Sequence, residues 1–131
     1  MVLLAACVGT NPLFASGPKE STLGDLMGDP GRYDGKEIVV IGVMQFDAVR
    51  YPYLFSDADH ATRDDPAGGL DVGTPTSVKI DGVLFTGPHC VAVSGRFMAY
   101  NDRMIITGNP RSRAGVVRAE SVKRTESRLC R

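Results

Sequence analysis

The chain of 131 residues has no tryptophan, only three cysteines, and 7% aromatic residues. It also lacks any run of about 18 apolar residues, the length that a membrane-spanning helix needs, so no spanning helix is predicted. Lys plus Arg equals Asp plus Glu at 15 each, so net charge does not draw the whole molecule to nucleic acid or to an anionic membrane. What remains is an ordinary hydrophobic content of 43%, in a chain whose length fits one domain.

Charge is distributed unevenly along this neutral chain. Residues 1–95 contain six basic and twelve acidic side chains, whereas residues 96–131 contain nine basic and three acidic ones. We favour charge pairing between the two parts within one compact fold, and the alternative is a basic docking surface near the C-terminus.

The periodicity from residue 21 onward predicts a mainly β fold. Ser21 is a candidate N-cap for a short helix that Pro30 ends. Six later segments have the composition or the period-2 alternation of strands: 37–46, 51–57, 77–81, 90–100, 104–107 and 116–124. Gly42 predicts a bulge or bend in the first of them, and residues 58–76 are rich in turn formers and predict a long loop. We therefore expect a small five- to six-stranded barrel with one short N-terminal helix.

Three stretches carry a family resemblance. DPGRYDGKEIVVIGV resembles the first strand of bacterial OB-fold proteins found in secreted and lipoprotein forms. YLFSDAD and CVAVSGRFMAY are similar to later strands of an uncharacterised OB-like group. The resemblance covers most of residues 22–124 and implies an OB-like (oligonucleotide/oligosaccharide-binding-like) barrel over residues 21–131, but it carries over no functional residues. Many OB barrels place a helix between their third and fourth strands, whereas the connection from Asp81 to His89 has room for one turn.

The N-terminus resembles a bacterial lipobox. Leu4, Ala5, Ala6 and Cys7 match the site where a signal peptidase cleaves and lipid is attached to the cysteine. The resemblance implies lipidation of Cys7 and a periplasmic, lipid-anchored location in the bacterial cell envelope. Only six residues precede Cys7, fewer than a complete signal needs. Translation therefore begins further upstream, or residues 1–7 are a truncated signal, or the match is accidental.

The segment 8–20 and the other two cysteines fit the same location. Residues 8–20 are rich in Gly, Pro and Ser and predict a flexible tether. Cys90 and Cys130 form an even pair once Cys7 is set aside, and an oxidising compartment would join them in a disulfide. The alternative is two free thiols in a reducing compartment.

Two groups of residues are candidate sites. Tyr51, Tyr53 and Phe55 alternate on one strand face, and with Lys79 and Arg96 nearby they could form a ligand-binding strip that stacks on bases. We favour packing of Phe55 and one of the tyrosines in the barrel core. The second group, which could chelate a cation, is acidic: Asp57, Asp59, His60, Asp64 and Asp65. It departs from the calcium-loop pattern, and a solvated acidic loop is favoured.

No enzyme motif accompanies these groups. His89 and Cys90 are adjacent on a predicted strand and point to opposite faces, so they are not expected to share a proton. We expect a monomeric, non-catalytic envelope lipoprotein with an OB-like module, no cofactor and no bound metal, whose partner is an envelope protein or a small ligand rather than nucleic acid. The alternatives are a soluble single-stranded nucleic-acid-binding OB protein and a metal-binding or hydrolytic protein.

Overall fold

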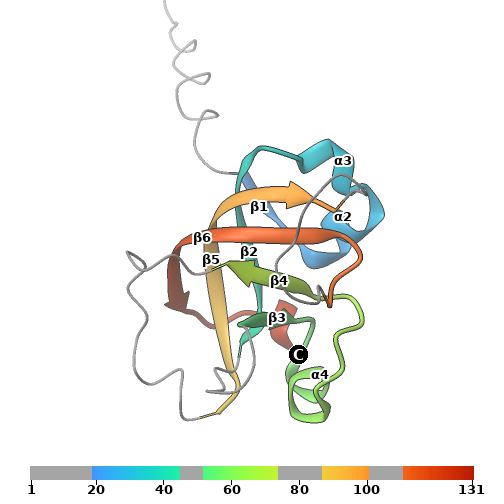
Figure 1. Cartoon of the computed structure of the whole chain (residues 1–131). Helices are drawn as coiled ribbons and strands as arrows, with labels where there is room; N and C mark the ends of the chain where they lie inside the picture. Colours follow the sequence, from blue (N-terminus) through green and yellow to red (C-terminus); the bar gives the residue numbers. More distant parts are fainter. Residues whose placement is uncertain (1–18, 45–51, 74–86, 101–110) are drawn as a thin grey trace, which may run out of the picture.

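The computed structural model describes residues 19–44, 52–73, 87–100 and 111–131 (Figure 1). Its strands are β1 (Lys19–Ser21), β2 (Glu37–Met44), β3 (Tyr53–Phe55), β4 (Leu70–Gly73), β5 (His89–Ala99) and β6 (Gly115–Arg124). Its helices are α2 (Leu23–Gly28), α3 (Pro30–Tyr33), α4 (Ala58–Arg63) and the 3₁₀ turn η2 (Arg128–Cys130). None of the helices in these ranges is long and apolar enough to cross a membrane.

Five of these strands close into a small barrel. Neighbouring strands follow the order β2, β3, β4, β6 and β5, and β5 pairs back with β2. The β4–β6 pair is parallel and the other four pairs of the ring are antiparallel. β1 is an additional strand, parallel to β2 beside residues 38–40. The mainly β fold class is therefore confirmed, as a mixed five-stranded barrel of OB-like size.

Alternating side chains of the strands fill the barrel. In β5, Val91, Val93 and Phe97 are fully buried, whereas Arg96 is exposed. The predicted period-2 strand at 90–100 is thus confirmed, with bounds His89–Ala99. The inner core also receives residues from β2, β3, β4 and β6, and α2 adds Leu23 and Leu26 to it.

The strand irregularity lies at Gly95 and not at Gly42. The β5–β6 register shifts between Ser94 and Gly95, and a Cβ at Gly95 would collide with the carbonyl of Arg118. β2 keeps an unbroken register with β5 through Gly42. The predicted bulge at Gly42 is wrong, because that glycine serves close approach instead: a Cβ there would lie 2.7 Å from the Cγ atom of Leu54.

The N-terminal helix begins one residue later than predicted. Thr22, not Ser21, is its N-cap, and it forms a capping box in which Thr22 Oγ1 accepts from the Asp25 amide and Asp25 Oδ2 accepts from the Thr22 amide. Pro30 does not simply end this helix. It occupies the first turn of the short helix α3, where a missing N–H costs nothing.

The predicted loop over residues 58–76 contains two regular elements, α4 and β4. Asp57 caps the start of α4, and Asp64, with φ of 54°, ends it in the left-handed conformation. α4 buries a single side chain, Ala61, so it has no hydrophobic periodicity to detect. β4 is only four residues long, and it supplies the third barrel strand.

Several predictions fall outside the described residues. These are the strands at 77–81 and 104–107, the part of the connection from Asp81 to His89 that precedes residue 87, and Cys7 with its lipobox. Lys19 and Glu20, at the end of the predicted tether, belong to β1, and Lys19 pairs with Ile38.

Candidate binding face

β3 and the adjoining end of β2 pack on both of their faces. Leu54 of β3 belongs to the inner core, whereas Tyr53 and Phe55 alternate to the outside of the barrel. Val43 of β2 pairs with Phe55 and faces the same way. Tyr53 and Phe55 are nevertheless only 1% and 4% exposed. They belong to a second apolar cluster, here called the outer cluster: Val43, Tyr53, Phe55, Ala61 and Cys130.

Two chain segments cover this outer face. α4 follows β3 directly and places Ala61 in the outer cluster. η2 approaches from the C-terminal end, and Figure 1 shows the C-terminus beside β3 and α4. Cys130 lies over β2, with its sulfur 3.2 Å from the carbonyl oxygen of Gly42. A disulfide sulfur carries no proton, so this is a packing contact and not a hydrogen bond.

Arg111 is the third part of the cover, and its guanidinium lies against the rings of Tyr53 and Phe55. Its guanidinium carbon lies 4.8 Å from the ring centroid of Tyr53 and 5.6 Å from that of Phe55. The two rings meet edge to face, with centroids 4.9 Å apart. One guanidinium nitrogen donates to Asp64 Oδ1 at 2.7 Å and to the Asp64 carbonyl at 3.2 Å. Arg111 therefore ties the rings to the end of α4 by cation–π contact and a charge-assisted hydrogen bond.

Buried polar groups complete this arrangement. The Tyr53 hydroxyl donates to the carbonyl of Pro66 at 2.6 Å, and burial, followed by the nearby Asp71 carboxylate, raises the pKa of Tyr53 far above its usual value. Asp71 Oδ2 accepts the amides of Arg111 and Ser112 at 3.0 and 2.9 Å. Burial raises the pKa of Asp71, and these two hydrogen bonds oppose the shift. The charged carboxylate thus fixes the backbone from which Arg111 reaches the rings.

The acidic group is used within the fold. Asp57 Oδ1 accepts from the His60 amide at 2.8 Å and lies 2.7 Å from His60 Nδ1, and these bonds hold the pKa of Asp57 below its usual range. Asp65 caps the amide of Ala67, and Asp64 pairs with Arg111. Among the described residues, no group of three or more His, Cys, Asp or Glu side chains is placed to hold a metal ion.

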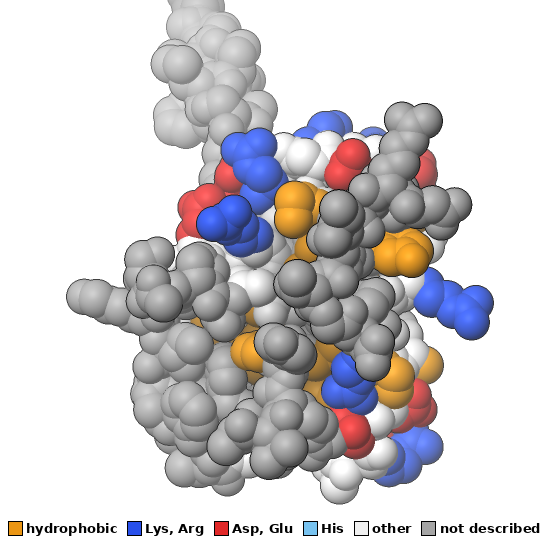
Figure 2. All heavy atoms as spheres, viewed as in Figure 1, with side chains coloured by type: hydrophobic (Ala, Val, Ile, Leu, Met, Phe, Trp, Pro, Cys, Tyr) orange, Lys and Arg blue, Asp and Glu red, His pale blue; other side chains and the backbone are white. Residues whose placement is uncertain are grey.

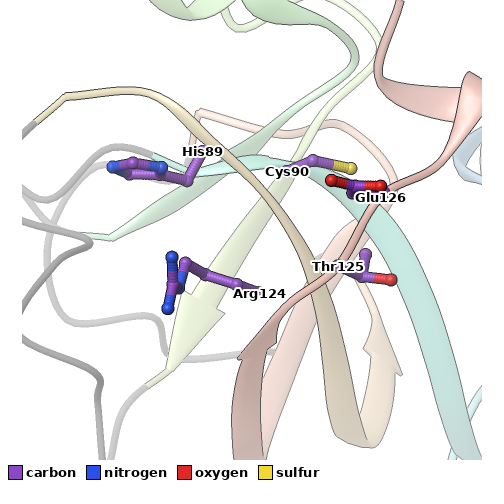
Figure 3. A pocket seen from close by; sticks show the side chains of 5 residues that line it. All are labelled: His89, Cys90, Arg124, Thr125 and Glu126. Carbon is purple, nitrogen blue, oxygen red and sulfur yellow. The ribbon is translucent and has the colours of Figure 1, made fainter.

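A disulfide joins Cys90 to Cys130, as predicted. Cys90 also lines an open hollow of about 380 Å³ beside Thr125 and Glu126. Figure 3 shows Cys90, Thr125 and Glu126 on one side of this hollow, while His89 and Arg124 point to the other. The disulfide that fastens η2 is therefore next to a surface opening, and Cys90 presents no thiol to a neighbouring base.

The charge distribution agrees with pairing between the two parts of the chain. Arg96 lies 3.1 Å from Glu37, and Arg111 lies 2.7 Å from Asp64. Each pair joins a cation of the basic C-terminal part to a carboxylate of the acidic N-terminal part. On the face drawn in Figure 2, basic and acidic side chains lie next to one another rather than in separate regions.

The sequence-predicted strip is only partly visible in the structure. Tyr53 and Phe55 share one face, as their spacing predicts, and they are buried, but in the outer cluster and not in the barrel core as favoured. Arg96 is on β5 and pairs with Glu37, so it is not part of the outer cluster. Tyr51 and Lys79 lie outside the described residues.

Sequence reasoning missed the residues that secure the outer face, Arg111, Asp71 and Ser112. Arg111 and Asp71 are 40 residues apart and meet because β4 and β6 are parallel neighbours. No sequence motif marks Arg111 or Asp71, and the strand β4 that carries Asp71 was not predicted. The cysteine count was the one usable signal, because it predicted that residue 130 returns to residue 90.

Comparison with protein families, curated proteins and solved structures finds no significant match to this chain.

Proposed function

We propose that this chain is a non-catalytic binding module of the bacterial cell envelope, anchored by lipid on Cys7 and folded as an OB-type barrel. Its partner is an envelope protein or a small ligand, and the module works as a monomer. OB barrels commonly bind ligands on the outer face of their second and third strands, and we propose the outer face of β3 and β4, covered in this structure, as its equivalent.

One observation carries the proposal, the disulfide between Cys90 and Cys130. Disulfides persist in oxidising compartments such as the periplasm and are rare in the cytosol, where thiols are kept reduced. The pairing also leaves Cys7 as the third cysteine, in a motif similar to a lipobox. A periplasmic domain with one remaining N-terminal cysteine supports lipidation there.

The side chains of the described residues support binding rather than catalysis. His60 contacts the carboxylates Asp57 and Asp65 and no nucleophile. Cys90 is oxidised in the disulfide, so it cannot act as a thiolate. Recognition of single-stranded nucleic acid by base stacking has less support, because Tyr53 and Phe55 are buried.

Mass spectrometry of the protein from a bacterial membrane fraction tests the anchor. The protein is expressed from its natural gene, and we expect a processed N-terminal peptide that begins with Cys7 and carries acyl chains. Cys7→Ser should abolish both processing and lipid, whereas the matched control Cys90→Ser should keep the lipid. Wild-type protein that keeps residues 1–6 and carries no lipid would refute the proposed location.

A further inference from the structure

The described segment after β6 buries few of its side chains. Of residues 125–131, only Cys130 is buried, and Leu129 is 44% exposed. The Thr125 amide donates to the Cys90 carbonyl at 3.0 Å, which fixes the start of the segment. Beyond it, the amides of Leu129 and Cys130 donate to the hydroxyl and the carbonyl of Ser127, within the segment itself. Among the described residues, Cys130 is thus the one buried attachment of residues 126–131, through its packing over β2 and its disulfide to Cys90.

We propose that residues 126–131 form a lid on the outer cluster, which the Cys90–Cys130 disulfide keeps closed and a dithiol reductant opens. The lid lies on the outer face of β2, where Val43 and Ile41 pack against Cys130. Opening it exposes an apolar face made of Ile41, Val43 and Phe55. The lid itself does not depend on the proposed function, but the role of the exposed face as a binding surface does.

The redox step is a thiol–disulfide exchange. A thiolate of the dithiol attacks Cys90 Sγ, the bond between the two sulfurs breaks, and Cys130 leaves as a thiolate that takes a proton from water. The second thiol of the reductant then displaces Cys90 and closes its own disulfide. The dithiol loses two electrons, and the protein gains two electrons and two protons. Cys90 is half-buried and is among the residues that line the open hollow, so we propose attack on its sulfur from that side (Figure 3).

Reduction releases the lid and leaves the rest of the cover in place. A single buried cysteine side chain contributes little burial, and six residues regain backbone freedom when the covalent tie is cut. α4 and Arg111 are attached independently, through Asp57 and Asp64. The open state therefore keeps the Tyr53 side of the cluster covered and uncovers the Val43 side.

Hydrogen exchange read by mass spectrometry or NMR tests the lid. The measurement uses the Cys7→Ser chain, so that no third thiol takes part in exchange, with and without dithiothreitol. We expect the amides of Leu129 and Cys130 to exchange at least about tenfold faster after reduction and to lose their protection, while amides of β2 and β5 stay protected at the level set by the lower global stability of the reduced protein. Cys90→Ser with Cys130→Ser, also in the Cys7→Ser background, should show the fast rates under both conditions.

Two results would overturn the lid. Unchanged exchange at Leu129 and Cys130 in the reduced protein would show that noncovalent contacts alone hold the segment. Complete loss of protection in β2 and β5 as well as in η2 would show that the reduced barrel unfolds as a whole and that the disulfide does not control a lid.

A fluorescent apolar dye, 1-anilinonaphthalene-8-sulfonate, tests the exposed face separately. We expect its emission to rise about threefold on reduction. Ile41→Ser should reduce this rise, whereas Val39→Ser, an equally oriented and half-buried position two residues away on β2, should not. Fast exchange at η2 without a dye signal would refute the binding face and leave the lid standing. Lipid on Cys7 together with a lid that stays closed would refute the lid and leave the anchored module standing.

Discussion

Replacing Arg111 tests how the outer face is held together. Arg111→Met keeps a long apolar stem over Tyr53 and Phe55 but removes the guanidinium. Arg111→Lys keeps a positive charge and one donor to Asp64, yet it loses the planar group that lies against two rings and reaches two oxygens. Comparing the two variants shows how much of the effect comes from the positive charge and how much from the planar guanidinium group.

The geometry sets the expected size of the effect. The guanidinium side chain is 25% exposed, so its contact with the two rings should contribute about 1 kcal/mol, between the values for exposed and desolvated pairs. Asp64 is 40% exposed, which limits the ion pair to about 0.5–1 kcal/mol after solvent screening. Arg111→Met should therefore lower the free energy of unfolding by about 2 kcal/mol, and Arg111→Lys by about 1 kcal/mol.

Urea unfolding followed by far-ultraviolet circular dichroism measures both values. Asp64→Asn, alone and combined with Arg111→Met, completes a double-mutant cycle, and its coupling energy should be about 0.5–1 kcal/mol. A free energy of unfolding for Arg111→Met within about 0.5 kcal/mol of the wild-type value, at an unchanged denaturant slope, would refute the reasoning. The outer face would then be secured by α4 and the disulfide without the arginine.

Three further predictions follow from the same contacts. Gly42→Ala places a methyl group 2.7 Å from both Leu54 Cγ and the Phe55 carbonyl and should cost about 2–3 kcal/mol by urea unfolding, whereas Gly28→Ala, with nothing within 4 Å, should be near neutral. Reduction of the Cys90–Cys130 disulfide, which closes a loop of 40 residues, should lower the free energy of unfolding by about 4 kcal/mol, and a smaller loss would mean that the reduced unfolded chain is already restricted. Asp57 has a lowered pKa, so its stabilising contribution is lost as pH falls below 3.8, and Asp57→Asn should flatten that acid limb of the stability curve measured by urea unfolding. Asp71 has a raised pKa, so wild-type stability should fall as pH rises from 3.8 to the folded pKa, and Asp71→Asn should remove that pH dependence.

The sequence predicts the long elements of the fold well. β5 and β6 are 11 and 10 residues long, and their alternating burial repeats often enough to identify both strands and their inward faces. α4 and β4 are shorter and carry almost no periodic signal. α4 depends on Asp57 and Asp64 at its two ends, where a polar loop has similar composition. Sequence reasoning therefore predicted the barrel class but did not predict β4, the third strand of the barrel.

The outer face is harder to predict than the barrel core. Alternation shows that Tyr53 and Phe55 share a face, but it cannot show whether that face is covered. The cover comes from Ala61, Arg111 and Cys130, which lie between 6 and 77 positions away along the chain. Only the tertiary pairing of β4 with β6, and the disulfide, bring the last two residues there.

The three parts of the cover differ in how they are attached. Ala61 belongs to a helix that follows β3 directly, so little chain entropy opposes its packing. Arg111 stands beside two backbone amides that Asp71 fixes. Cys130 ends a segment without another buried side chain, and its position depends on one covalent bond. A perturbation that weakens the whole cover should therefore free the C-terminal segment first, and Phe55 should lose its cover on the Cys130 side before Tyr53 loses its cover by Arg111.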